Sequence, residues 1–528
     1  MPKSARSNAE RVSSSRNDPM EAPEHSPPAA AGEQYAVESG SRLVILVVAI
    51  MLATLLQTLD GTIVNVALPV IQGNLGATFD EGAWVVTGYI ISAVVVIPIT
   101  PWLQLRFGRR QYYATAIFGF TLASVFCGLS GSIGTLIFWR VIQGAFGGGL
   151  IATGQAALRD TFPADKLGLS QGIFALGAIV GPTVGPTLGG LLTDNFSWNY
   201  VFLINIVPGT IAGITILAMM KNPTAPRRLP LDALGLVLLA AGLGSLQFVL
   251  DEGQRRDWFN DDLILALACT AAAAIATFVC WELFGARSPI VDLKAFRYRG
   301  VMAGSVLAIV TGASLFGTIV VLPQYVQSIL NFTATLSGEL ILLRAIVTGV
   351  LTMAIVRLVG SGRIDSRILL AAGFALVAAS NLWLASVSTS TTPFWSLAEP
   401  LMLAGAGLAL VFIPLSIAVL SSVPGEVAPK ATAFVNLFLQ LGGSISTAAL
   451  VTLLSHREAF HQTILAAGVT LHSSLVRDVV AHHQLNVLYH ALVQQANTMA
   501  FADASYLVGF AGFFCIPLVF LLERRKRA

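Results

Sequence analysis

The chain has 528 residues, of which 55% are apolar and only 11% charged, and its formal net charge is +3. Soluble domains are roughly 45–50% apolar and about 25% charged, so this composition excludes a soluble globular protein. The charges lie in short clusters between apolar runs that, at about 1.5 Å per residue, are long enough to cross a hydrocarbon core of roughly 30 Å. The sequence therefore predicts an all-α polytopic membrane protein that contacts membrane lipids and has no nucleic-acid partner.

Residues 1–41 precede the first apolar run and are rich in Ser, Pro and charged residues. They lack the short apolar region and cleavage site of a signal peptide, so we predict a disordered cytoplasmic arm. The first helix would then be its own uncleaved insertion signal. The four cysteines lie within later apolar runs, where they are expected to be small buried side chains and not disulfide or zinc ligands. They are Cys127, Cys269, Cys280 and Cys515.

Fourteen transmembrane helices are predicted from the apolar runs. They cover residues 43–68, 81–101, 111–130, 134–157, 168–193, 199–219, 232–250, 262–284, 301–323, 336–356, 368–388, 396–421, 430–453 and 505–523. Most of the 31 Lys and Arg residues then fall in connections on the side of the N-terminus, as cytoplasmic loops require. One missed or invented helix would reverse every later loop, so the pattern also predicts that both termini are cytoplasmic.

The chain also contains a faint internal repeat. The loop after helix two reads LRFGRRQYY and the loop after helix ten reads GSGRIDSRIL. A general excess of basic residues in cytoplasmic loops explains the charge, but not the shared glycine and matching position. We therefore predict two six-helix halves, 42–220 and 301–523, with helices seven and eight (232–284) inserted between them. Parallel halves are typical of transporters that rock around a central site.

The first apolar run carries one carboxylate, Asp60. A charged residue at this depth costs roughly 2.5–3.5 kcal/mol on insertion scales and usually marks an ion or substrate pathway. Helix one runs outward and helix four inward, which places Asp60 roughly 12 Å and Arg140 roughly 9 Å below the same surface. We predict that they pair. The pair either is a permanent ion pair that only fixes packing, or contains a carboxylate that gains and loses a proton during transport.

Other polar residues are candidates for the same pathway. Arg344 in helix ten occupies the equivalent level of the second half, and Glu339 lies close to one end of that helix, near its start. Gln57, one turn before Asp60, and Asn65 are expected to share the polar network of Asp60.

Helix five carries the densest pattern, GAIVGPTVGPTLGGLL, over residues 177–192. Its glycines recur every four residues and so lie on one face, where a second helix approaches closely. Its two prolines remove backbone hydrogen bonds. Tight packing is the simpler explanation, but two Gly-Pro steps favour a hinge or bend. The residues concerned are Gly177, Gly181, Pro182, Gly185, Pro186 and Gly189.

Several of these stretches resemble motifs of the major facilitator superfamily and, within it, of the fourteen-helix drug:proton antiporters of the EmrB/QacA type. They are LDGTIVNVALPVIQGNL (59–75), RVIQGAFGGG (140–149), the helix-five stretch, SWNYVFLIN (197–205) and FVNLFLQLGGSI (434–445). The resemblance covers residues 43–523. It implies the major facilitator fold, a bacterial inner-membrane location, a role of Arg140 in proton transfer, and export associated with the helix-five motif.

The loop after helix two departs from the superfamily pattern. Pro101 stands where glycine is usual, and Leu105 where aspartate is usual, whereas the basic residues of the cytoplasmic gate loop, Arg106, Gly108, Arg109 and Arg110, are retained. The gate is therefore expected to be built differently. In helix six, Asn199 replaces an arginine that is common in the family.

Residues 454–504 form the one long external connection and hold six of the seven histidines. Their spacing is irregular and lacks a Cys or acidic cluster, so no metal site is predicted. Apolar residues at helical spacing predict one or two amphipathic helices lying on the outer surface. Relatives in two-membrane bacteria work with a periplasmic adaptor and an outer-membrane channel, and this connection is a candidate contact for such an adaptor.

The sequence thus predicts a proton-coupled secondary exporter of hydrophobic or amphipathic compounds, without a cofactor and without enzymatic activity. The candidate residues for its substrate pocket, besides Gln57 and Asn65, are Trp84, Tyr89, Gln324 and Tyr325. No GxxxxGK[ST] loop for an ATP-driven pump occurs. A dedicated exporter of one lipid, siderophore or secondary metabolite is the main alternative, followed by a channel or a membrane-embedded enzyme.

Overall fold

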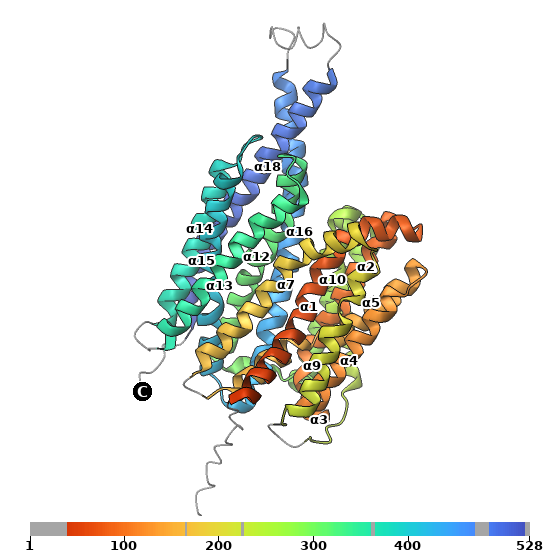
Figure 1. Ribbon diagram of the computed structural model, residues 1–528, viewed down its shortest axis with the longest axis vertical. Helices are drawn as coiled ribbons and strands as arrows, with labels where there is room; N and C mark the ends of the chain where they lie inside the picture. Colours follow the sequence, from red (N-terminus) through yellow and green to blue (C-terminus); the bar gives the residue numbers. More distant parts are fainter. Residues whose placement is uncertain (1–39, 164–165, 223–225, 361–364, 470–484, 523–528) are drawn as a thin grey trace, which may run out of the picture. The chain divides into compact units, whose positions relative to one another are not determined.

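The computed structural model describes residues 40–163, 166–222, 226–360, 365–469 and 485–522 (Figure 1). All regular elements in these ranges are helices. Thirteen of them are long and apolar enough to cross a membrane, and α4 corresponds to the remaining predicted span. The predicted all-α polytopic fold is therefore confirmed. The predicted disordered arm falls almost entirely outside the described residues.

The first six predicted spans are built from helices α1 to α9. Some spans contain two helices, because a 3₁₀ helix (Ile97–Ile99), two glycines (148–149) or a turn (204–205) interrupts them. Their bounds are α1 (Gly40–Leu75), α2 (Phe79–Val96), α3 (Thr100–Phe107), α4 (Arg109–Gly128), α5 (Ile133–Gly147), α6 (Leu150–Thr161), α7 (Leu167–Asn195), α8 (Tyr200–Leu203) and α9 (Ile206–Met219).

The remaining spans follow the same pattern of long apolar helices. Their bounds are α10 (Ala233–Glu252), α11 (Asp262–Cys280), α12 (Arg299–Ser328), α13 (Ala334–Gly360), α14 (Ser366–Val387), α15 (Phe394–Ser421), α16 (Ala428–Gly468) and α18 (Leu485–Cys515).

Local sequence explains where several helices begin and end. Thr78 and Glu81 form a capping box at the start of α2, and Ser132 with Thr135 forms another at the start of α5. Each box satisfies backbone N–H groups that the first helical turn leaves without partners. Gly108 separates α3 from α4 with a φ of +85°, a conformation that side chains other than glycine rarely adopt.

Helix packing follows the same order in the two predicted halves. In the first half α1 packs against α7, α2 against α5, and α4 against both α5 and α9. In the second half α12 packs against α16, α13 against α15, and α14 against both α15 and α18. These pairs occupy matching places in the predicted series of fourteen spans. We infer from this parallel that the halves are structural repeats.

The predicted inserted pair, α10 and α11, packs beside the junction of these halves. The two helices contact one another, and α10 also contacts α2 of the first half and α16 of the second. Trp84 of α2 and Phe248 of α10 have ring centroids 5.1 Å apart. The pair is thus in a position to contribute side chains to any site between the halves.

The glycine face of α7 packs against α1, as the four-residue spacing predicted. A Cβ atom on Gly181 would lie 2.8 Å from the backbone nitrogen of Leu59, and one on Gly189 would lie 2.7 Å from the carbonyl oxygen of Ile63. Helix α7 contains both Pro182 and Pro186 and is assigned as one continuous helix. The hinge remains a prediction.

The long external connection differs from the expectation of helices lying on the surface. Helix α16 instead continues to Gly468, and α18 begins at Leu485, so both extend beyond the neighbouring helix ends (Figure 1). They pack against each other. Oδ2 of Asp503 in α18 lies 2.8 Å from Nε2 of His461 and 3.3 Å from Nε of Arg457, both in α16. In the described part of this connection, apolar side chains such as Phe460, Val487 and Tyr489 remain exposed, so the pairing covers only part of the apolar pattern. His472, His482 and His483 lie outside the described residues.

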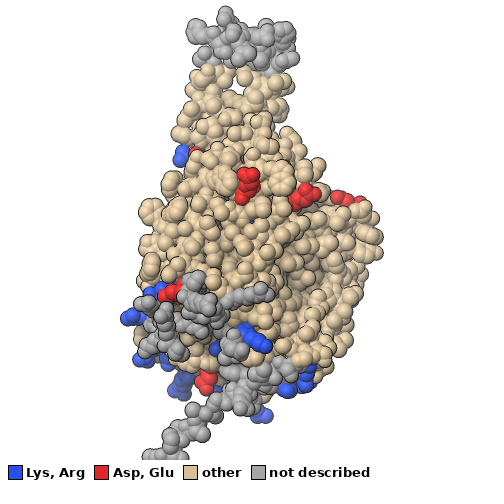
Figure 2. All heavy atoms as spheres, turned by 60° about the vertical axis from the view of Figure 1, so that its left-hand side comes forward, with Lys and Arg blue, Asp and Glu red and all other residues tan. Residues whose placement is uncertain are grey.

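Basic residues gather at one end of the helices. On the face drawn in Figure 2, most Lys and Arg side chains lie at the end that carries α3 in Figure 1. This is the end assigned to the cytoplasm by the excess of Lys and Arg in its connections.

Candidate functional site

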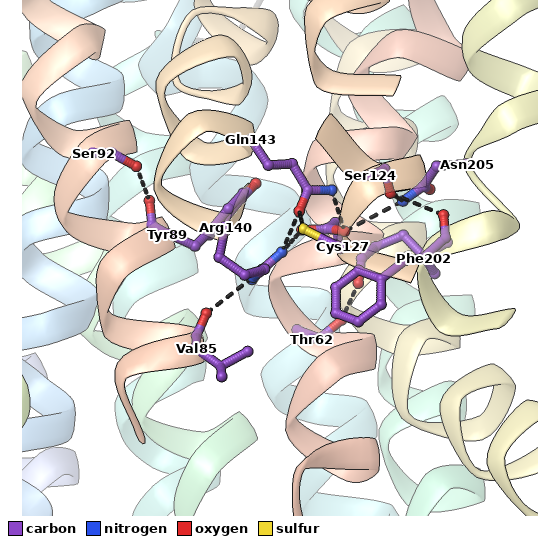
Figure 3. Close-up of polar contacts among 12 residues, drawn as sticks. Thr62, Val85, Tyr89, Ser92, Ser124, Cys127, Arg140, Gln143, Phe202 and Asn205 are labelled. Atoms are coloured by element: carbon purple, nitrogen blue, oxygen red, sulfur yellow. Dashed lines mark hydrogen bonds and ion pairs between the residues drawn. The ribbon is translucent and has the colours of Figure 1, made fainter. Parts of the chain in front are cut away.

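A buried cluster of charged and amide side chains joins the helices of the first half (Figure 3). Arg140 of α5 places its Nη1 atom 2.5 Å from Oδ2 of Asp60 in α1. Gln143 accepts a hydrogen bond from the same Nη1 at 2.8 Å and donates one to Oδ1 of Asp60 at 2.9 Å. Asp60 is 0% and Arg140 1% exposed. The structure therefore brings together the two charges that were predicted to pair.

Two further polar residues complete the cluster. Asn205 donates a hydrogen bond to Oδ1 of Asp60 at 3.3 Å and another to Oγ of Ser124 at 3.0 Å. Sequence reasoning missed Gln143, Asn205 and Ser124, because uncharged polar residues cost less in a membrane and stand out less. Their only signal was that Gln143 and Asn205 lie inside the quoted motifs RVIQGAFGGG and SWNYVFLIN.

Arg140 is held from several sides. Its Nε donates to the carbonyl oxygen of Val85 at 2.9 Å, and its guanidinium carbon lies 4.2 Å from the ring centroid of Tyr89 and 5.7 Å from that of Phe202. Cations over aromatic faces are attracted by the ring quadrupole, more strongly where water is excluded. The guanidinium is thus held by hydrogen bonds and by two aromatic rings in addition to its ion pair with Asp60.

A cavity of about 510 Å³ lies beside this cluster. It is lined by residues of both halves and of α10. Its aromatic wall consists of Tyr89, Phe174, Phe316 and Phe412. Because Tyr89 lines the cavity and also contacts Arg140, the cavity and the ion pair share one side chain. The volume and mixed lining suit a drug-sized amphipathic molecule.

Three of the predicted pocket residues line this cavity, namely Gln57, Asn65 and Tyr89. Gln57 accepts a hydrogen bond from the backbone N–H of Ile151 at 3.1 Å. Neither Gln57 nor Asn65 hydrogen-bonds to Asp60, which corrects the expectation of a shared network. Both side chains belong to the cavity wall instead.

The other three predicted pocket residues do not line the cavity. Trp84 packs on Phe248, and Gln324 is exposed. Tyr325 is buried, donates to the carbonyl oxygen of Thr389 at 2.7 Å and stacks on Phe501 at 4.1 Å. Its position is explained by packing between α12 and α18.

The two second-half candidates for proton coupling lie apart from the Asp60 cluster. Arg344 is buried and donates to the carbonyl oxygen of Ser314 at 3.3 Å, and no carboxylate of the described residues lies within 4.0 Å of it. Glu339 is exposed near the start of α13. The structure therefore does not bring them together with Asp60 and Arg140.

An amide cluster joins the halves at one end of the cavity. Gln155 of α6 donates to Oε1 of Gln171 at 3.0 Å and to Oγ of Ser416 at 3.3 Å, and it accepts from Nδ2 of Asn436 at 2.9 Å. Ser416 and Asn436 belong to α15 and α16 of the second half. These hydrogen bonds hold the two halves together in the described conformation.

The predicted gate loop is built around Arg109. This side chain donates to Asp160 at the end of α6 and to Oε1 of Gln104 at 3.0 Å, while Nε2 of Gln104 donates to Thr153 at 3.1 Å. Arg106 donates to the carbonyl oxygen of Leu229. Leu105 cannot supply the carboxylate that is usual in this loop, and the acidic partner of Arg109 comes from α6 instead.

Replacing Asp160 by Asn should destabilise the protein. Arg109 is only 7% exposed and would lose its charged partner. We expect a loss of about 2–3 kcal/mol, below the roughly 3–5 kcal/mol typical of a fully buried pair, because Asp160 keeps contact with water. Equilibrium unfolding in mixed SDS micelles measures this loss. The double variant Arg109→Met, Asp160→Asn should recover most of it, and a single variant as stable as the wild type would contradict the assignment.

Comparisons with known proteins agree with this geometry. The sequence profile of the Major Facilitator Superfamily matches residues 50–447. The chain is 35% identical over 440 residues to the multidrug export protein EmrB of Escherichia coli strain K12, covering 83% of this chain and 85% of that protein. It is 32% identical over 502 residues to the fatty acid resistance protein FarB of Neisseria gonorrhoeae, covering 93% and 98%.

A solved structure supports the fold. The human organic anion transporter MFSD10 superimposes with a TM-score of 0.57 over 90% of this chain and 100% of that chain, at 14% sequence identity. At this identity the likeness concerns the fold alone.

Proposed function

The chain belongs to the Major Facilitator Superfamily, and on that premise we propose that it is a multidrug exporter that couples efflux of hydrophobic or amphipathic compounds to an inward flow of protons. The observation that carries the proposal is the buried Asp60–Arg140 ion pair beside a drug-sized cavity with aromatic walls. The similarity to EmrB, whose name records multidrug export, supports the substrate class.

Proton uptake by Asp60 is the coupling step of this mechanism. Protonation removes the negative charge that faces Arg140, so the ion pair and the hydrogen bond from Gln143 lose their strength together. Tyr89, which lies over Arg140 and lines the cavity, carries that change to the substrate site. Loss of the proton restores the pair. Arg140 thus competes with the proton for Asp60.

Alternating access requires the Gln155 cluster to open. The cluster links the halves at one end of the cavity, and each hydrogen bond contributes about 0.5–1.5 kcal/mol. Gln155→Leu should therefore shift the population towards the state that is open at the cytoplasmic end.

A single cysteine at the buried position Ile417, in a chain with its native cysteines replaced by Ala, would report this shift. We expect a membrane-impermeant maleimide to label it about tenfold or more faster in Gln155→Leu than in the parent, since the variant loses about 1.4 kcal/mol or more of closing free energy. Gln111→Leu, at an exposed position, is the control. Equal labelling rates in all three proteins would show that the cluster does not hold the halves closed.

The proposed function is tested in inside-out vesicles with an acid lumen and a trapped pH dye. If the protein is a proton-coupled exporter, an added drug enters the lumen in exchange for protons, so the luminal pH rises. A hydrophobic drug panel that binds the purified protein but never moves protons would refute proton-coupled export and favour a channel or a partner-dependent protein.

A dedicated lipid exporter is the second candidate, favoured by the likeness to a protein named for fatty acid resistance over 93% of this chain. A response confined to fatty acids in the same vesicles would support it. In either case we propose a multi-pass protein of the bacterial inner membrane with both termini cytoplasmic. The paired extensions of α16 and α18 would contact a periplasmic adaptor that leads to an outer-membrane channel.

A further inference from the structure

The cavity contains one carboxylate that the proton mechanism does not use. Asp251 lies in the last turn of α10 and lines the cavity. Its Oδ1 accepts a hydrogen bond from Gln247 at 2.8 Å, whereas its Oδ2 is buried and has no hydrogen-bond partner. No basic side chain of the described residues lies within 4.0 Å of this carboxylate. Leaving a buried charged acceptor without a donor is costly, so such a group calls for a partner.

Its neighbour Gln247 repeats this shortage of donors. The side chain is fully buried, and its Nε2 donates both to Asp251 and to Oγ of Ser444 in α16 at 2.8 Å. Its Oε1 is buried without a partner. Gln247 and Asp251 are four residues apart and so share a helix face. Two neighbouring acceptor atoms therefore lack donors, one on Asp251 in the cavity wall and one on the fully buried Gln247 behind it.

The other charges of the cavity wall compensate one another. Besides Asp251, the charged residues that line the cavity are Glu252 and Arg255. Arg255 Nη2 lies 3.0 Å from Oε2 of Glu252, and Arg256 lies 4.0 Å from the same oxygen. Asp251 is thus the charge that the described cavity wall leaves uncompensated, and aromatic side chains such as Phe316, which suit an apolar body, line the same cavity.

From these contacts we propose that Asp251, oriented by the hydrogen bond from Gln247, forms a subsite of the drug cavity for the protonated amine of an amphipathic substrate. A primary ammonium group brings a positive charge and several N–H donors, which match the uncompensated carboxylate and its unsatisfied Oδ2. A quaternary ammonium group would supply the charge but no donor. The proposal rests on the proposed drug-export function, and it gives the inserted helix pair a role in substrate selection.

The test uses two probes that differ only at the amine. Dansylcadaverine carries a fluorescent apolar ring system and a primary amine, and its N-acetyl derivative keeps the ring system but is neutral. Fluorescence titration of the purified full-length protein in detergent at neutral pH gives a Kd for each. Asp251→Asn should raise the Kd of the amine by about tenfold or more, as loss of a charged hydrogen bond implies, and leave the Kd of the acetylated probe within about twofold.

The control is Asp262→Asn, which removes the same charge from an exposed position at the start of α11 and should change neither Kd. Equal weakening of both probes by Asp251→Asn would show a disturbed cavity and overturn the subsite. Unchanged binding of both probes would also overturn it. If Asp251→Asn bound both probes normally but failed to exchange protons in vesicles, Asp251 would be a proton site and the proposal would be wrong. A wild type that binds neither probe would instead count against the drug cavity itself.

Discussion

Asp60→Asn is expected to abolish drug-driven proton exchange. In inside-out vesicles with an acid lumen, the luminal pH should rise on drug addition with the wild type and stay at the level of protein-free vesicles with the variant. Asparagine keeps the size of the side chain and can still accept a hydrogen bond from Arg140. Its amide does not take up a proton at the pH values of the experiment. Asp60 is the one carboxylate in the described cluster around Arg140. No other group of that cluster can therefore take up the proton in its place.

Controls must separate coupling from folding. Asp194→Asn removes an exposed carboxylate near the end of α7 and should exchange protons like the wild type. Asp60→Asn leaves the buried Arg140 without its charged partner and should melt at a lower temperature than the wild type, so drug binding by the variant is the measurement that shows it is folded. If the variant binds drug and still exchanges protons at the wild-type rate, the ion pair only fixes packing, and the exposed Glu339 becomes the next carboxylate to test.

The sequence predicted the ion pair because charge in a membrane is costly and two opposite charges at one depth must meet. It did not predict Gln143 or Asn205, because neutral amides cost less in a membrane than charges and their direction depends on how α1, α5 and α9 rotate against one another. Tyr325 was misassigned since an aromatic residue beside a glutamine suits either a pocket or a packed interface. Only tertiary contacts distinguish the two.

Helix ends were the least predictable feature. The predicted seventh span ends at residue 250, which leaves Asp251 in the following polar connection. In the structure α10 continues to Glu252, and Asp251 lines the cavity. Likewise, helical periodicity in the external connection agrees with α16, which continues to Gly468, and with α18, which begins at Leu485, but it does not reveal what these helices contact. The contacts of Asp503 with α16 show that the two helices pair with each other.

Gly181→Leu should disturb the packing of α7 on α1 next to the ion pair. A Cβ atom at this position would lie 2.8 Å from the backbone nitrogen of Leu59, the residue before Asp60. Backbone cannot yield as a flexible side chain can, so α1 must move away from α7 at the turn that carries the ion pair. Overpacking of this kind costs typically about 1–3 kcal/mol. We expect a lower melting temperature and loss of proton exchange together.

Gly190→Leu provides the matched control on the same helix. A Cβ atom there would meet Val66 at 4.0 Å, which is ordinary van der Waals contact. This variant should melt and exchange protons like the wild type, although it carries the same change in a glycine-rich helix. If both variants lost function equally, helix flexibility and not close approach would be what the glycines provide. Gly181→Leu could instead lose proton exchange and keep its melting temperature. The folded protein would then tolerate the larger side chain while the transport cycle would not. The contact of α7 with α1 would in that case serve the motion between transport states.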